Sequence, residues 1–162
     1  MSVIFIGHTG STPLGDLWVA VSGTGLVAVQ FPAEQIDFTA GLQKKHAASV
    51  EFSQEKVRDI VLQLQEYAAG QRKEFSLPID WTVLGEFQRI ALQATCKIPY
   101  GKTRTYKDIA LEIGRPLAAR AVGRAEATNP MRLYCPVIVS LAQIENCMAT
   151  GLAMVWKQKP GC

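Results

Sequence analysis

Histidine is scarce in this sequence, and the residues that could hold a zinc ion lack the spacing of known zinc sites. Of the 162 residues, two are histidines and four are cysteines, and no two cysteines form a Cys-x-x-Cys pair. Zinc fingers and zinc ribbons are therefore excluded, and we expect neither a metal nor a cofactor.

Long apolar runs are also absent. Stretches such as residues 3–6 and 136–139 are far shorter than the roughly 20 residues of a membrane span. The first residues show neither a charged leader nor a long apolar segment, so no signal peptide is expected. We therefore predict a soluble, cytoplasmic protein that does not contact a membrane. We also expect the protein to be a monomer.

The charge is distributed unevenly along the chain. The formal net charge is +3, but residues 1–80 contain six basic and nine acidic side chains, whereas residues 81–162 contain eleven basic and five acidic ones. A chain of this length forms one compact unit or two small domains. The basic excess is densest between residues 97 and 124, which indicates either a solvated face or a phosphate-binding surface.

The first half has the pattern of a small α+β module. Two β-branched runs, residues 17–22 and 26–31, flank a Gly-Thr-Gly turn and predict a hairpin. Residues 55–69 place apolar side chains at helical spacing before Gly70, which predicts an amphipathic helix. The alternation of apolar and polar residues from Phe75 to Ile79 predicts a strand.

The second half is predicted to be helical. Residues 87–96 and 106–113 have helical periodicity, and Thr105 with Asp108 resembles a helix start. Gly114 ends the second helix, and a third helix over about 117–127 begins near Pro116. Two helices joined by a tight glycine turn suggest a helix-turn-helix.

Small side chains dominate the third helix. Alanine and glycine fill most of residues 118–123, while Arg120 and Arg124 stand one turn apart. Such a surface permits the close approach of a nucleic-acid groove, with the arginines reaching out. The alternative is a helix packed tightly on its neighbour.

Three motifs identify the family that the chain resembles. Ile98-Pro-Tyr-Gly-Lys-Thr-Arg-Thr-Tyr-Lys-Asp-Ile-Ala110, Ala118-Ala-Arg-Ala-Val-Gly123 and Asn129-Pro130 together are similar to the O6-alkylguanine-DNA alkyltransferases, or methylated-DNA–protein-cysteine methyltransferases. The resemblance spans roughly residues 9–130. It implies an α+β fold with a small ribonuclease-H-like module over residues 1–80 and a winged helix-turn-helix-like DNA-binding domain over residues 81–130.

The resemblance also implies a reaction and roles for individual residues. A damaged guanine is flipped out of double-stranded DNA, and its O6-alkyl group moves irreversibly to a cysteine of the protein. Arg120 matches the arginine that fills the vacated space, and Tyr106 matches the tyrosine that presses on the target phosphate. Gly123 lies in the helix that enters the minor groove, and Asn129 matches the asparagine that braces the active-site turn. Without the resemblance, Tyr106 could equally be a core aromatic residue with a satisfied hydroxyl.

The sequence departs from the family after Pro130. The acceptor motif Pro-Cys-His-Arg-Val is missing, and spacing places Val137 at the cysteine position and Ile138 at the histidine position. Cys135, two positions early, is the remaining candidate for the catalytic acceptor. Because a cysteine needs a neighbouring base or cation to become a thiolate, and no histidine follows Cys135, we predict that this chain is inactive.

A change of reading frame accounts for the departure. If the third base of each codon is joined to the first two bases of the next, the codons from Cys135 onward permit Pro-Cys-His-Arg-Val-Ile-Gly-Thr-Asp. We therefore hypothesise that residues 131–162 form an aberrant segment, read out of frame from about Arg132.

Two other functions remain open. A non-enzymatic alkyltransferase-like module would bind damaged guanine without accepting its alkyl group. A helix-turn-helix transcription regulator is disfavoured, because residues 118–123 offer few polar side chains that could read base edges.

Overall fold

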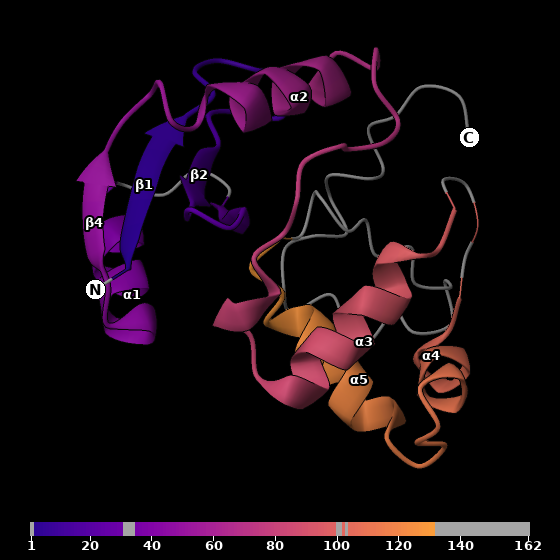
Figure 1. Cartoon of the computed structure of the whole chain (residues 1–162). Helices are drawn as coiled ribbons and strands as arrows, with labels where there is room; N and C mark the ends of the chain where they lie inside the picture. Colours follow the sequence, from indigo (N-terminus) through magenta and orange to yellow (C-terminus); the bar gives the residue numbers. More distant parts are fainter. Residues whose placement is uncertain (1, 31–34, 100–101, 103, 132–162) are drawn as a thin grey trace. The chain divides into compact units, whose positions relative to one another are not determined.

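A computed structural model describes residues 2–30, 35–99, 102 and 104–131 (Figure 1). These residues separate into two compact units. The first, called the sheet unit, contains the described part of Met1–Gly85 together with Pro130 and Met131. The second, called the helical unit, contains the described part of Glu86–Asn129. The whole is an α+β fold, as the sequence predicted.

The sheet unit is built on four strands and two helices. Its elements are β1 (Val3–His8), β2 (Trp18–Val21), β3 (Leu26–Gln30), α1 (Gln35–His46), β4 (Ser49–Phe52) and α2 (Arg58–Ala68). The strand order is β3-β2-β1-β4, with β1 and β4 parallel and the other pairs antiparallel. Figure 1 shows β1 and β4 side by side.

The two faces of this sheet are covered by different helices. Ile4 and Ile6 of β1 form a buried cluster with Phe38 and Leu42 of α1. Because successive strand residues point to opposite faces, Gly7 faces the other way. There, a Cβ on Gly7 would lie 2.3 Å from Val57 Cγ2, so the glycine allows the start of α2 to approach the sheet.

Several predictions for this unit are confirmed. β2 and β3 form the predicted hairpin, and α2 lies within the predicted helix and ends before Gly70, whose φ is +75°. The strand predicted over residues 75–79 is wrong, because this segment forms only an isolated bridge at Ile79. Pro78 lacks the N–H that a strand would donate, and its carbonyl accepts from Leu26 N at 2.9 Å.

The helical unit contains α3 (Glu86–Cys96), α4 (Tyr106–Glu112) and α5 (Ala119–Ala127). Ala94 of α3, Ile109 and Ala110 of α4 and Val122 of α5 form its apolar cluster. All three helices were predicted, with ends that differ by a few residues. The turn between α4 and α5 gives the predicted helix-turn-helix.

The chain then returns to the sheet unit. Val29 N of β3 donates to Pro130 O at 2.7 Å, and Met131 is fully buried beside that strand. Asn129 is thus the last described residue of the helical unit. Over the described ranges, no helix has the length and apolar character needed to span a membrane.

Candidate nucleic-acid interface

The start of α4 is held by a capping box. Thr105 Oγ1 accepts from Asp108 N at 3.1 Å, and Asp108 Oδ2 accepts from Thr105 N at 2.9 Å. The hydrogen bond from the Thr105 backbone, followed by that from its side chain, lowers the pKa of Asp108. Reciprocal capping satisfies backbone groups that the first helical turn leaves free. It therefore places Tyr106 firmly as the first residue of α4.

Tyr106 and Gly123 lie against each other. The half-buried Tyr106 packs on the apolar cluster of the helical unit, and a Cβ added to Gly123 would lie 3.1 Å from Tyr106 Cδ2 and Cε2. Such a separation is tighter than ordinary van der Waals contact. Glycine at position 123 therefore gives the tyrosine ring room against α5, and the structure brings two of the sequence-predicted site residues together.

The turn between α4 and α5 is fixed by backbone hydrogen bonds. Gly114 has a φ of +73°, which glycine adopts without strain. Arg115 N donates to Ala110 O at 2.8 Å, and Ala118 N donates to Arg115 O at 2.9 Å. The Arg115 guanidinium lies 5.8 Å from the centre of the Phe87 ring on α3. These contacts set the position at which α5 begins.

One stripe of α5 is exposed to solvent. It consists of side chains three or four residues apart: Arg120, Ala121, Arg124, Ala127 and the following Thr128. The opposite side of the helix, with Val122, Ala125 and Glu126, is buried. Among the described residues, Arg120 and Arg124 have no acidic side chain within salt-bridge distance. The stripe therefore combines low bulk with two uncompensated positive charges.

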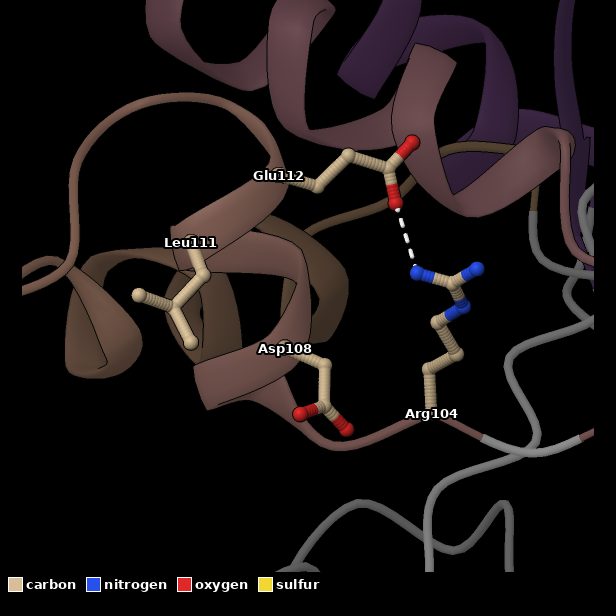
Figure 2. A pocket seen from close by; sticks show the side chains of 4 residues that line it. All are labelled: Arg104, Asp108, Leu111 and Glu112. Atoms are coloured by element: carbon tan, nitrogen blue, oxygen red, sulfur yellow. Dashed lines mark hydrogen bonds and ion pairs between the residues drawn. The ribbon is translucent and has the colours of Figure 1, made fainter.

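Arg104 differs from these two arginines. Its Nη1 donates to Glu112 Oε2 at 2.9 Å across an open hollow of about 560 Å³, which Asp108 and Leu111 also line (Figure 2). Arg104 falls in the stretch between residues 97 and 124 where the basic excess is densest. In the structure Arg104 is paired with the carboxylate of Glu112 on α4. This carboxylate weakens the electrostatic attraction between Arg104 and a phosphate.

Asn129 lies at the end of α5 beside a buried carboxyl group. It is 2% exposed, and its backbone N donates to Glu126 O at 3.1 Å. Glu126 is itself only 4% exposed, and Thr95 Oγ1 of α3 hydrogen-bonds to both Ala91 O and Glu126 Oε1. Glu126 Oε2 is buried without a hydrogen-bond partner among the described residues.

Burial dominates the ionisation of Glu126. Burial raises the pKa of the carboxyl group to about 7. Hydrogen bonds from the Thr95 and Asn129 side chains lower the pKa, but by less than burial raises it. A buried carboxyl group is costly to ionise when its hydrogen bonds do not replace the hydration that it loses. Near neutral pH the group is therefore divided between its neutral and its charged form.

Known proteins resemble this chain in sequence and in fold. Residues 6–81 match the profile described as the ribonuclease-like domain of 6-O-methylguanine DNA methyltransferase, and residues 86–139 match its DNA binding domain. The constitutive methylated-DNA–protein-cysteine methyltransferase of Bacillus subtilis (strain 168) is 37% identical over 130 residues, which cover 79% of this chain and 75% of the relative. The chain belongs to the 6-O-methylguanine DNA methyltransferase family.

Other members of the methyltransferase family support this placement. The Methanosarcina barkeri (strain Fusaro / DSM 804) methylated-DNA–protein-cysteine methyltransferase is 34% identical, with 77% of this chain and 75% of the relative covered. A crystal structure of Mycobacterium tuberculosis OGT in complex with DNA has a TM-score of 0.63 and 29% identity, covering 85% of this chain and 79% of that one.

Sequence reasoning missed Glu126 and its partner Thr95. Helical periodicity could have drawn attention to the glutamate, because it lies four residues after the buried Val122 on the same side of α5. Nothing in the local sequence indicates Thr95, which is 31 residues away along the chain.

Cys135, the candidate acceptor in a methyltransferase of this kind, lies outside the described residues. Over the part that is described, no group of three or more histidine, cysteine, aspartate or glutamate side chains could hold a metal ion.

Proposed function

We propose that this chain binds duplex DNA containing O6-alkylguanine through the exposed stripe of α5 and turns the damaged base out of the helix. The observation that carries the proposal is the stripe itself, in which Arg120 and Arg124 project beside alanines and no acidic side chain of the described residues lies within salt-bridge distance of them. Small side chains let the helix approach a narrow groove closely, and cations attract its phosphates.

Each site residue has a role in this proposal. Arg120 enters the base stack and occupies the space of the extruded guanine, which offsets part of the few kcal/mol that unstacking costs. Tyr106, placed by the capping box and by its contact with Gly123, presses on the backbone phosphate beside the target. Asn129, buried at the end of α5, braces the chain where it leaves the helical unit.

We further propose that this chain binds damage without accepting the alkyl group. In the family reaction a cysteine thiolate attacks the alkyl carbon, a C–S bond forms, and the bond to guanine O6 breaks with its electrons returning to the base. Val137 and Ile138 stand where the cysteine and its histidine belong. Cys135 has no histidine after it to remove its proton.

The departure after Pro130 leads to a proposal about the gene. Residues 131–162 are an aberrant, out-of-frame segment, and the in-frame protein is a cytoplasmic monomeric methyltransferase. Sequencing the coding DNA around the Pro130 codon tests this directly. A shifted frame that encodes Pro-Cys-His-Arg-Val supports the proposal, and the absence of that motif from both alternative frames contradicts it.

Binding is tested by fluorescence anisotropy with two duplexes that differ only in one O6-methylguanine. We expect the full chain to prefer the methylated duplex, and Arg120→Ala to abolish most of that preference. Arg58→Ala, which removes an exposed arginine from the sheet unit, is the charge-matched control and should bind like wild type. Equal binding of both duplexes by the wild-type chain would contradict damage recognition.

An alkyl-transfer assay distinguishes binding of damaged DNA from transfer of the alkyl group to the protein. DNA carrying a labelled O6-methyl group is incubated with an excess of protein, and intact and peptide masses are measured. We expect binding without a mass increase. Stoichiometric methylation of Cys135 would instead establish an active methyltransferase and overturn the prediction that this chain is inactive.

A further inference from the structure

Leu117 is the most exposed large apolar residue of the described chain. Its relative exposure is 99%, compared with 54% for Leu111 on α4. A single exposed leucine is common on protein surfaces and means little by itself. The position of Leu117 is informative, because it lies in the turn that leads into α5, three residues before Arg120 and four before Ala121.

Leu117 comes directly before Ala118, the N-cap of α5, so it lies at the N-terminal end of the helix from which Arg120 projects. The proposed function assigns the exposed stripe of this helix to DNA. The stripe carries no acidic side chain, since Glu126, the acid of α5, is buried on its other side. Leu111 instead lies in the hollow with Asp108 and Glu112, which would repel phosphates.

The backbone presents Leu117 in a fixed position. Pro116 restricts its own φ, and hydrogen bonds from Arg115 N and Ala118 N close the turn on either side. A side chain on a restrained turn loses less conformational freedom on binding than one on a loose loop. The turn therefore holds a leucine in water where no described neighbour covers it.

We propose that Leu117 is an apolar wedge that enters the minor groove beside Arg120 and packs against deoxyribose and base edges. This inference rests on the proposed function. Proteins that bind the minor groove often insert apolar side chains between base pairs, which partially unstacks the bases and bends the duplex. Leu117 would then supply a part of the binding free energy that does not depend on salt, while Arg120 and Arg124 supply the salt-dependent part.

The test measures the dissociation constant of the full chain for a duplex with one O6-methylguanine between about 50 and 200 mM salt. Leu117→Ala should weaken binding about 5- to 10-fold at every salt concentration and leave the salt dependence unchanged, because only apolar contact area is lost. Leu117→Met, which restores the volume, should bind nearly as wild type. Leu111→Ala is the matched control and should have no effect.

A charge substitution sharpens the test. Leu117→Lys should still weaken binding at high salt, because a lysine cannot replace the apolar contact inside the groove. If this variant binds more tightly at all salt concentrations, position 117 faces phosphates and the wedge is wrong. Circular dichroism of each variant checks that the helices are retained, as expected for a side chain that is almost fully exposed.

Failure of the inference can be distinguished from failure of the proposed function. If Leu117→Ala binds as wild type while Arg120→Ala binds weakly, the wedge is wrong and the DNA-binding face stands. If neither substitution changes binding, α5 does not face DNA and both proposals are wrong. A loss that appears only at low salt would also overturn the wedge, because it would mark an electrostatic effect.

Discussion

Asp80 of the sheet unit and Glu126 of the helical unit are both buried acids, each 4% exposed, yet their ionisation is displaced in opposite directions. Burial alone would raise the pKa of Asp80, but hydrogen bonds from Ser22 and Thr82 outweigh it and lower the pKa overall. Burial of Glu126 prevails and raises its pKa to about 7.

The difference lies in the number of donors that each carboxyl group meets. Asp80 Oδ2 accepts from Ser22 Oγ at 2.5 Å, and its Oδ1 accepts from Thr82 N at 3.1 Å and Thr82 Oγ1 at 2.5 Å. Both oxygens are thus satisfied, one by Ser22 at the end of β2 and the other by Thr82 two residues on. In Glu126, Oε1 accepts from Thr95 Oγ1, and this hydrogen bond together with the one from the Asn129 side chain does not offset burial.

The comparison separates an acid whose charged form is stabilised by hydrogen bonds from one whose charged form is disfavoured by burial. Asp80 caps the short 3-10 helix Trp81–Val83 and is stabilised in its charged form. Glu126 is one turn from Asn129, on the buried side of the helix that carries the stripe proposed to bind DNA. Perturbed carboxyl groups concentrate near functional sites, because such sites tolerate local instability.

The largest effect is expected from removing Asp80. Asp80→Ala leaves Ser22 and Thr82 without their charged acceptor, and it should lower the free energy of unfolding by roughly 3 kcal/mol, since hydrogen bonds to charged groups are worth about 1.5–3 kcal/mol each. Urea denaturation followed by circular dichroism measures the loss. Glu55→Ala removes an exposed acid from the same unit and should change stability little. A loss below about 1 kcal/mol would show that the Asp80 network does not hold the fold.

The pH dependence of the wild-type chain should come next in size. Because the folded pKa of Glu126 is raised from 4.5 to about 7, the folded state binds the proton more tightly than the unfolded state. The stabilisation that the folded state gains from the Glu126 proton is fully present below about pH 4.5 and is lost as the pH rises through 7. The free energy of unfolding should fall by roughly 2–3 kcal/mol between about pH 5 and 8. Hydrogen exchange of α5 amides measures this, and protection that is independent of pH would contradict the assignment.

Asp80 predicts the reverse dependence in acid. Its lowered pKa stabilises the sheet unit above the usual aspartate pKa of about 3.8, and this contribution is lost as the pH falls through the lower folded value. Hydrogen exchange in β2 and β3 should therefore accelerate only in strong acid. Loss of protection in the sheet unit between pH 5 and 8 would show that the two units do not differ in their pH dependence, and it would contradict the prediction.

A smaller effect is expected from making Glu126 neutral at every pH. Glu126→Gln keeps the size and polarity of the side chain but cannot ionise, so it should remove the slope and stabilise the helical unit at pH 8 by roughly 1–2 kcal/mol. Glu86→Gln, at an exposed position in the same unit, should leave the slope in place. If Glu126→Gln destabilises the helical unit at pH 8, the charged form is better accommodated than its burial indicates.

The smallest effect is expected from Thr95, which is the one hydroxyl found on Glu126 among the described residues. Thr95→Val retains the shape, removes the hydrogen bond and should raise the pKa of Glu126 further, at a cost of about 1 kcal/mol at pH 8. Ser22→Ala should likewise raise the pKa of Asp80. Carbon-13 NMR titration of both carboxyl groups measures the two pKa values. An unchanged pKa for either acid would show that the substituted hydroxyl does not contribute to that acid's pKa.

Much of the fold was predictable because its signals are local. The hairpin of β2 and β3, the amphipathic α2 and α3, and the capping box of Thr105 and Asp108 each depend on residues a few positions apart. The strand expected at 75–79 shows the limit of such patterns. Its side chains do alternate between half-buried and exposed, but Pro78 prevents the pairing that would make it a strand.

Other elements escaped prediction because their stabilising contacts are distant. α1 buries only Phe38 and Leu42, which is too few for a clear helical pattern, and β4 is recognisable only by its parallel pairing with β1. Parallel strands need a long connection, so no short-range signal marks them.

The motifs around Tyr106, Arg120 and Asn129 are enough to assign the family, and local periodicity is enough to place the helices that carry them. Three features became visible only once the helices were packed: Gly123 makes room for the Tyr106 ring, Arg104 pairs with Glu112, and Glu126 is buried against Thr95. Periodicity and capping are encoded by neighbouring residues, whereas burial and charge pairing depend on which helices pack together.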